Sequence, residues 1–196
     1  MNRNITRLSK SDGPFLVQVA KRAIEKYVKI GERDKLLDNL PPHLMSKRGV
    51  FVTITMILNG ETIPRGCVGY PRPTLPLVES VRDLAIKAAS EDPRYSSLAP
   101  GELDQIQIEV SVLSLPKMIL VKKPIEYPNK IQVGRDGLIL EWSGGSSLLL
   151  PQVAEEQGWD SEEFLCNLCM KAGAPIDQWL SPEVKMYKFS SQVYSE

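Results

Sequence analysis

Two stretches of the chain repeat apolar residues every third or fourth position, which is the spacing of one face of an α-helix. The first can begin at Asp12 or Gly13, and Gly31 suits its end. The second follows Thr74, its predicted N-cap, and stops at Asp92, which precedes a proline. Both patterns predict amphipathic helices with one buried face. The predicted buried face of the second consists of Val78, Val81, Leu84, Ala85 and Ala88.

Two β-branched, apolar runs flank the dipeptide Asn59-Gly60, which is a strong signal for a tight hairpin. A two-residue turn predicts the opposed pairs Val52–Cys67, Ile54–Arg65 and Met56–Ile63. Opposed side chains share one face of a sheet, so Arg65 and Cys67 are expected on the apolar face. Pro64 and Gly66 weaken this register, because one inserted residue would turn every later side chain to the other face.

A strict alternation of apolar and polar residues around Glu109 predicts a strand with this carboxylate on its polar side. A second hairpin is predicted around Gly144-Gly145, and a last strand over 183–196. Two shorter helices are predicted between them, one starting near Pro151 and one capped by Asp160.

These elements predict an α+β fold, in which antiparallel hairpins are flanked by helices. The segment 117–134 is rich in proline and lysine and poorly periodic, which indicates an excursion from the main sheet. We expect a single domain over 1–196, with a small subdomain of about 116–136 plus part of 137–180. A chain of this length buries roughly two-thirds of its unfolded surface, so it needs no disulfide or metal to fold.

Charge and composition narrow the classes of function. Lysine plus arginine and aspartate plus glutamate number 24 each, which leaves no electrostatic footprint for nucleic acid or an anionic membrane. The N-terminus has no apolar core of the signal-peptide kind, and no apolar run is long enough to span a membrane. Three cysteines do not make a disulfide framework. We expect a cytoplasmic protein without a cofactor, and a homo-oligomer stays open.

His43 is the only histidine, and this restricts both catalysis and metal binding. Any Ser-His-Asp or Cys-His mechanism must use it, and a multi-histidine metal site within one chain is excluded. Cys166 and Cys169 have C-x-x-C spacing, but they lie inside a predicted helix, with Cys169 on the core face and Cys166 off it. A redox motif of that kind belongs at a helix start, so we expect neither a redox nor a metal site.

Five segments, in order along the chain, resemble the AMMECR-domain family. They are PRGCVGY (64–70), DPRYSSL (92–98), EVSVL (109–113), LLLPQVAEEQGWDSEEFLCNLCMKAG (148–173) and YKFSSQVYSE (187–196). The resemblance covers the chain from about Leu37 to its end. Its most specific pieces are 65–69, 150–153 and 171–173.

The resemblance implies an α+β fold in two parts, with the arginine-glycine-cysteine motif near their junction. It implies no assigned activity. In some organisms the domain is joined to, or encoded near, a Memo-like protein and a radical-SAM protein, which implies a partnership in a modification pathway. The usual motif has leucine before the arginine and isoleucine after the cysteine, where this chain has Pro64 and Val68. The motif itself is intact.

Cys67 and Glu109 are the candidate catalytic residues. Cys67 can act as a nucleophile, since a nearby Arg65 would favour its thiolate and backbone N–H groups could approach a substrate oxygen. The alternative is a small buried cysteine in a strand. Glu109 can serve as a general acid or base.

Arg65 is more informative than Cys67, because an unpaired buried guanidinium is costly. Its candidate internal partners are Glu109, Asp92 and Glu102. Otherwise it can clamp a carboxylate or phosphate through two hydrogen bonds.

The predicted ligand site also includes Gly66 and Gly69, where the backbone can approach a ligand, and the loop residues Asp92 and Arg94. If this loop lies beside Arg65, both arginines would attract an anion. The alternative is a helix end held by local hydrogen bonds.

We therefore predict a protein that binds a small anionic ligand or a protein partner in a cleft near 65–69. One alternative is an enzyme that uses Cys67 or Glu109 in a modification pathway. Another is an adaptor that docks a partner through an exposed apolar patch, with the motif serving only stability.

Overall fold

The computed structural model of the chain describes residues 8–36, 39–72 and 75–196. The chain divides into two compact units. The first runs to Val112 and is completed by Gln192–Glu196, and the second is Leu113–Ser191. The subdomain predicted over about 116–136 and part of 137–180 lies within the second unit, which is wider at both ends.

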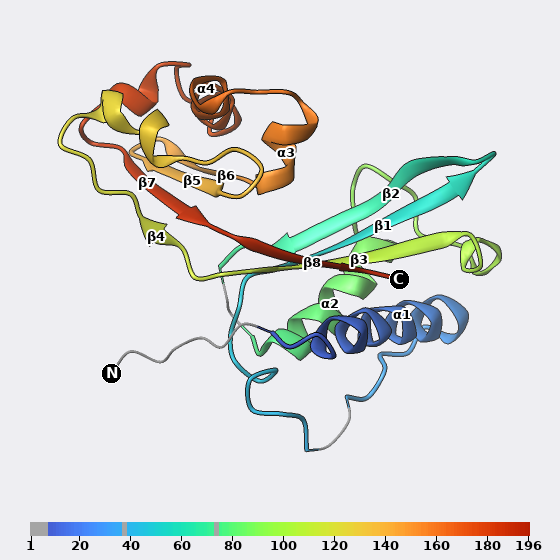
Figure 1. Cartoon of the computed structure of the whole chain (residues 1–196). Helices are drawn as coiled ribbons and strands as arrows, with labels where there is room; N and C mark the ends of the chain where they lie inside the picture. Colours follow the sequence, from blue (N-terminus) through green and yellow to red (C-terminus); the bar gives the residue numbers. More distant parts are fainter. Residues whose placement is uncertain (1–7, 37–38, 73–74) are drawn as a thin grey trace. The chain divides into compact units, whose positions relative to one another are not determined.

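The first unit is one four-stranded sheet with two helices on a single face (Figure 1). The strand order is β2-β1-β3-β8. The bounds are α1 Asp12–Ile30, β1 Val50–Leu58, β2 Glu61–Tyr70, α2 Leu77–Ser90, the 3-10 turn η1 Pro100–Glu102, β3 Ile106–Leu113 and β8 Ser191–Ser195. Inward-facing residues of β1 and β3 pack with α1 and α2 into one core. The predicted α+β fold is confirmed.

Both predicted helices form, with the buried faces that their spacing indicates. All five predicted core positions of α2 are buried. Gly31 ends α1 in the left-handed conformation, φ 72°, where its N–H donates to the carbonyl of Tyr27. The N-caps differ from those predicted: Ser11 precedes α1, while α2 starts only after Pro76. Thr74, the predicted cap of α2, lies outside the described residues.

The β1–β2 hairpin turns at Asn59-Gly60, and both residues have positive φ, as a type I′ turn requires. Near the turn the predicted register holds, with Met56 opposite Ile63. Beyond it a bulge shifts the pairing, because Arg65 has no opposite residue between the pairs Thr55–Pro64 and Ile54–Gly66. The predicted pairs Val52–Cys67 and Ile54–Arg65 are therefore wrong.

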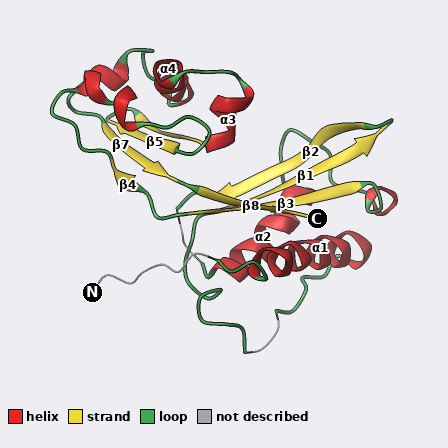
Figure 2. Ribbon diagram, viewed as in Figure 1, coloured by secondary structure: helices red, strands yellow, loops and turns green. Residues whose placement is uncertain are grey.

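The second unit is a four-stranded sheet of order β4-β7-β5-β6, with α3 and α4 packed against it (Figure 2). Its elements are β4 Lys117–Met118, η2 Pro124–Glu126, η3 Pro128–Lys130, β5 Gly137–Trp142, β6 Gly145–Leu149, α3 Pro151–Glu156, α4 Ser161–Lys171, η4 Gln178–Leu180 and β7 Lys185–Phe189. Asp160 and Glu163 form the predicted capping box at the start of α4.

The tail 183–196, predicted as one strand, forms two strands in different sheets. Lys185–Phe189 is β7 of the second sheet, and Ser191–Ser195 is β8 of the first. Ser190 lies between them, where its N–H donates to the hydroxyl of Ser114 and its carbonyl accepts the Ser114 N–H. A period of two identifies extended chain but does not say which sheet the chain joins, and this explains the error.

Candidate functional site

The bulge at Arg65 decides which face of the first sheet carries the thiol of Cys67. After the bulge Cys67 lies opposite Thr53, and Thr53 in turn lies opposite Glu109 on β3. All three side chains point to the outer face, away from α1 and α2. The Thr53 hydroxyl donates to the Cys67 sulfur over 3.1 Å, and the Ser111 hydroxyl donates to the Glu109 carboxylate. The structure thus places both candidate catalytic residues in one row across three strands.

The outer face next to Cys67 also holds an aromatic ring. Gly69 follows Cys67 on the same face, and a Cβ added there would lie 2.1 Å from the ring of Phe51. Phe51 is directly opposite Gly69 on β1, so its ring lies over the glycine. Glycine at this position makes room for the ring beside the thiol.

Gly66 faces the opposite way, into the core. A Cβ at Gly66 would lie 2.1 Å from the carbonyl oxygen of Ala88 in α2. The glycine therefore permits close packing of β2 on α2. The ligand-binding roles of Gly66 and Gly69 stay predictions, and packing accounts for both residues.

Arg65 is paired inside the chain. Its Nε donates to Glu102 over 2.7 Å and a terminal nitrogen to the other Glu102 oxygen over 3.0 Å. Its terminal nitrogens also donate to the carbonyls of Ser96 and Ser97. The pKa of Arg65 is raised, chiefly by the hydrogen bonds that it donates to Glu102. Of the three predicted partners, Glu102 is the one that holds the guanidinium, whose side chain is only 11% exposed.

Asp92 and Arg94 hold the main chain of Cys67 itself. The Cys67 N–H donates to Asp92 over 2.8 Å, and Arg94 donates to the Cys67 carbonyl over 3.1 Å. Nε and a terminal nitrogen of Arg94 also bond both oxygens of Asp92. These Arg94 bonds, with that from the Cys67 N–H, hold the Asp92 pKa well below its usual range despite burial.

The last residue of the motif is bound as well, by side chains that sequence reasoning did not identify. The Tyr70 hydroxyl donates to Asp83 and accepts from Lys87. Arg33 donates to the other Asp83 oxygen over 2.8 Å. Burial raises the pKa of Asp83, but these hydrogen bonds outweigh burial, so the pKa of Asp83 is lowered.

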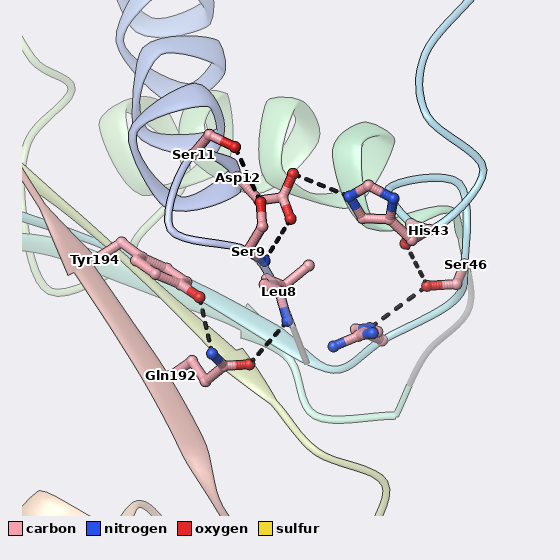
Figure 3. A network of polar contacts seen from close by, with 9 residues as sticks. Leu8, Ser9, Ser11, Asp12, His43, Ser46, Gln192 and Tyr194 are labelled. Atoms are coloured by element: carbon pink, nitrogen blue, oxygen red, sulfur yellow. Dashed lines mark hydrogen bonds and ion pairs between the residues drawn. The ribbon is translucent and has the colours of Figure 1, made fainter. Parts of the chain in front are cut away.

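His43 takes part in a different network (Figure 3). Its Nε2 lies 2.9 Å from a carboxylate oxygen of Asp12, at the start of α1, on the helix-covered side of the sheet. The other Asp12 oxygen accepts the Ser9 N–H. Burial raises the pKa of Asp12, but the hydrogen bonds from His43 and Ser9 outweigh burial, so the pKa of Asp12 is lowered. The imidazole thus lies on the side of the sheet opposite to the Cys67 thiol.

Cys166 and Cys169 are placed as predicted, with Cys169 fully buried in the second core and Cys166 half-buried. Burial raises the pKa of Cys169 to about 11. Within the ranges that the structure describes, no three His, Cys, Asp or Glu side chains come together as a metal site would require. Those ranges also contain no helix with the length and apolarity needed to cross a bilayer.

Comparison with known proteins assigns the family. The sequence profile of the AMMECR1 family matches residues 17–194. The chain belongs to the AMMECR1 family. The resemblance of the motifs to the AMMECR-domain family is thereby confirmed.

Relatives of this AMMECR1-family chain include archaeal proteins. A protein of Methanothermobacter thermautotrophicus is 47% identical over 189 residues, with 96% of each chain covered. A protein of Thermofilum pendens is 46% identical, with 97% of this chain and 92% of the relative covered. The crystal structure of uncharacterized protein PH0010 from Pyrococcus horikoshii matches with a TM-score of 0.89 at 46% identity, over 96% of this chain and 93% of that one.

Sequence reasoning identified Cys67 and Glu109 in this AMMECR1 chain but missed Thr53, which completes the row, and Phe51, which lies opposite Gly69 beside it. Their alternation with buried residues along β1 indicates an outward face. What was missing was the register, since the bulge decides that Cys67 shares this face with them. The juxtaposition of Pro64 and Gly66 was the available signal for a bulge.

Proposed function

We propose that this AMMECR1-family chain acts through the thiol of Cys67, as the nucleophile of a modification reaction on the outer face of the first sheet. The observation that carries the proposal is the row Cys67–Thr53–Glu109, with the Thr53 hydroxyl donating to the sulfur. A hydroxyl donor supports negative charge on sulfur, and the thiolate is the nucleophilic form.

The surroundings of the thiol support this function more than a binding site for a small anion. An anion clamp needs guanidinium donors that are available to a ligand. Arg65 is neutralised by Glu102, and Arg94 by Asp92. Because both arginines are paired inside the chain, the groups that we propose to act on the outer face of the first sheet are Cys67, Thr53 and Glu109.

The proposed step is addition of the sulfur to an electrophilic carbonyl carbon of a ligand or a partner protein. The S–C bond forms as the C=O π bond opens, and the thiol proton passes through water to the oxygen that receives the π electrons. Two strand spacings, roughly 9–10 Å, separate Cys67 from Glu109. Glu109 is therefore too far for a direct hydrogen bond to the sulfur. It is placed to act as a general acid or base on a ligand that spans both strands.

Electrophilic probes of graded reactivity test this proposal. Folded protein is treated with one equivalent of a chloroacetamide, an acrylamide or a vinyl sulfone, and adducts are counted by intact mass. We expect one adduct per chain in the wild type and in Cys166→Ser, and none in Cys67→Ser. An adduct that persists at full yield in Cys67→Ser would overturn the proposal.

A second candidate function is protein docking through the second unit. Large apolar side chains are exposed around η2 and η4, which contact each other. They are Leu120, Ile125, Ile176 and Leu180. Exposed apolar side chains that gather in one region of a surface are typical of interaction sites. If they join two copies of the chain, sedimentation equilibrium will show a dimer that Leu120→Ser with Ile125→Ser dissociates, whereas a monomeric wild type excludes self-docking.

A further inference from the structure

The segment 91–102, which joins α2 to η1, is tied to β2 by Arg65. The guanidinium donates to both Glu102 oxygens and to the carbonyls of Ser96 and Ser97, at 2.7–3.3 Å. Because the bulge leaves Arg65 without an opposite residue on β1, its side chain is directed at this segment instead. One buried side chain thereby holds the segment at three residues.

The same segment also contacts β2 at Cys67, two residues after Arg65. β2 is an edge strand, so alternate peptide groups point away from β1 and need another partner. For Cys67 that partner is the Asp92–Arg94 pair, which accepts from the N–H and donates to the C=O. A carboxylate and a guanidinium thus replace a neighbouring strand at the residue that carries the thiol.

The carboxylate of this pair is rigidly held. Asp92 is 3% exposed and also accepts the N–H of Arg94 over 3.1 Å. Charge-assisted hydrogen bonds are the strong ones, and a buried carboxylate with four of them has little freedom to move. The Cys67 backbone is therefore bonded to a group that is itself fixed in place.

We propose that Arg65, Asp92 and Arg94 are positioning residues that set the place of the Cys67 thiol, and that Arg65 acts through the segment 91–102 rather than by touching a ligand. The inference rests on the proposed function of Cys67. Removing Arg65 releases the segment, the segment releases Asp92 and Arg94, and the Cys67 backbone loses both bonds. Reactive groups need placement within about 0.5 Å, so this release weakens the thiol chemistry without removing the thiol.

Amide hydrogen exchange, resolved by residue, tests this chain of effects. We compare wild type with Arg65→Met, Asp92→Ala and Arg94→Met, the last of which changes an exposed side chain. Exchange at the Cys67 amide is expected to rise about tenfold in each, while the β1–β3 ladder is unaffected. Arg135→Met is the control matched to Arg94→Met. Arg135, 57% exposed against 60% for Arg94, pairs with the buried carboxylate of Asp136 but lies in the second unit.

Unchanged exchange at Cys67 in Arg65→Met would overturn the inference, as would a uniform rise across β1 and β3. If Arg65→Met does not fold, exchange at the Cys67 amide is measured in Arg65→Lys and Arg94→Met instead. Lysine at position 65 serves because it lacks the paired donors of arginine. Alkylation of Cys67, measured against Cys166 in the same variants, is the second readout and should fall while Cys166 is unchanged. Exchange does not depend on thiol reactivity, so an unreactive wild-type Cys67 refutes the proposed function, whereas the exchange result judges the positioning by itself.

Discussion

Cys67 and Cys169 are thiols in the two units of the chain, and their surroundings differ in almost every respect. Cys169 lies on the core face of α4 and is fully buried among apolar side chains, which raises its pKa to about 11. Cys67 is half-buried on the outer face of β2, accepts a hydroxyl hydrogen bond and has its peptide groups held by a charged pair. Burial makes the first thiol inert, whereas the second lies in the polar surroundings where we propose that it reacts.

The difference follows from the position of each cysteine relative to its element. On α4 the helical period alone assigns Cys169 to the core. On β2 the period of two is interrupted by one extra residue at Arg65, and only this interruption turns Cys67 outward. Changes that relax the bulge or its anchors should therefore affect Cys67 and leave Cys169 as it is.

The largest effect is expected from Arg65→Met, which leaves the partly buried Glu102, 26% exposed, without its partner. Breaking a buried ion pair from one side costs about 3–5 kcal/mol of unfolding free energy, and because this pair is partly exposed we expect about 3 kcal/mol. Urea denaturation of Arg65→Met and of the control Arg135→Met measures this loss. The control should lose no more than about 1 kcal/mol, since Arg135 is exposed and Asp136 keeps its hydrogen bonds from Gln132 and Lys188. Equal losses in the two variants would contradict the anchoring role of Arg65.

Gly66→Ala tests the close approach of β2 to α2. The added methyl would lie 2.1 Å from the carbonyl of Ala88, which is backbone and cannot turn aside. Overpacking of this kind costs about 2–3 kcal/mol. Gly101→Ala is the matched control, because nothing lies within 4 Å of its added methyl. A Gly66→Ala protein with wild-type thermal stability would refute the packing explanation of the motif glycine.

Asp92→Asn should lower stability in a pH-dependent way. The folded-state pKa of Asp92 lies below its unfolded value of about 3.9, so its contribution is complete above that pH and is lost as the pH falls toward the folded value. We expect wild type to exceed Asp92→Asn by about 2 kcal/mol at pH 7, and the difference to shrink below pH 4. Urea titrations at pH 7, 5 and 3 measure it, and a constant difference would contradict the account.

Asp136→Asn is the control that separates a general loss of stability from a change in the position of Cys67. The Asp136 pKa is also lowered, by hydrogen bonds from Arg135, Gln132 and Lys188 that outweigh burial, so the same pH trend is expected. Only the Asp92 variant should change the alkylation rate of Cys67.

The smallest effect on stability is expected from Thr53→Val, which keeps the shape of the side chain and removes the hydroxyl. Loss of one partly exposed hydrogen bond costs about 0.5–1 kcal/mol. The alkylation rate of Cys67 should nevertheless fall, and Thr53→Ser should restore it. A Thr53→Val protein that reacts as fast as wild type would show that the Thr53 hydroxyl does not promote the reaction of Cys67.

Sequence patterns predicted the elements of this protein well because their signals are local. The apolar spacing of α1 and α2, the Asn59-Gly60 turn and the capping box at Asp160 each lie within a few residues of the structure that they predict. The division of the tail between two sheets was missed, since alternation says nothing about which strand lies alongside.

The residues of the candidate site were named from the sequence, but their arrangement could not be. Cys67 does meet Asp92 and Arg94, yet its face depends on the bulge at Arg65, which Pro64 and Gly66 signal without fixing the residue that is left unpaired. Arg65 needed a partner on physical grounds, but choosing Glu102 over Asp92 or Glu109 required the position of η1. Thr53 has no local signal, because its role exists only once Cys67 is placed opposite.

The relative reactivity of the thiols tests the central claim most directly. Folded wild-type protein is given a short pulse of iodoacetamide at neutral pH, and modification of Cys67, Cys166 and Cys169 is quantified by peptide mass spectrometry. The account predicts that Cys67 reacts faster than the half-buried Cys166 and at least about tenfold faster than Cys169. A Cys67 that reacts as slowly as the buried Cys169 would contradict it.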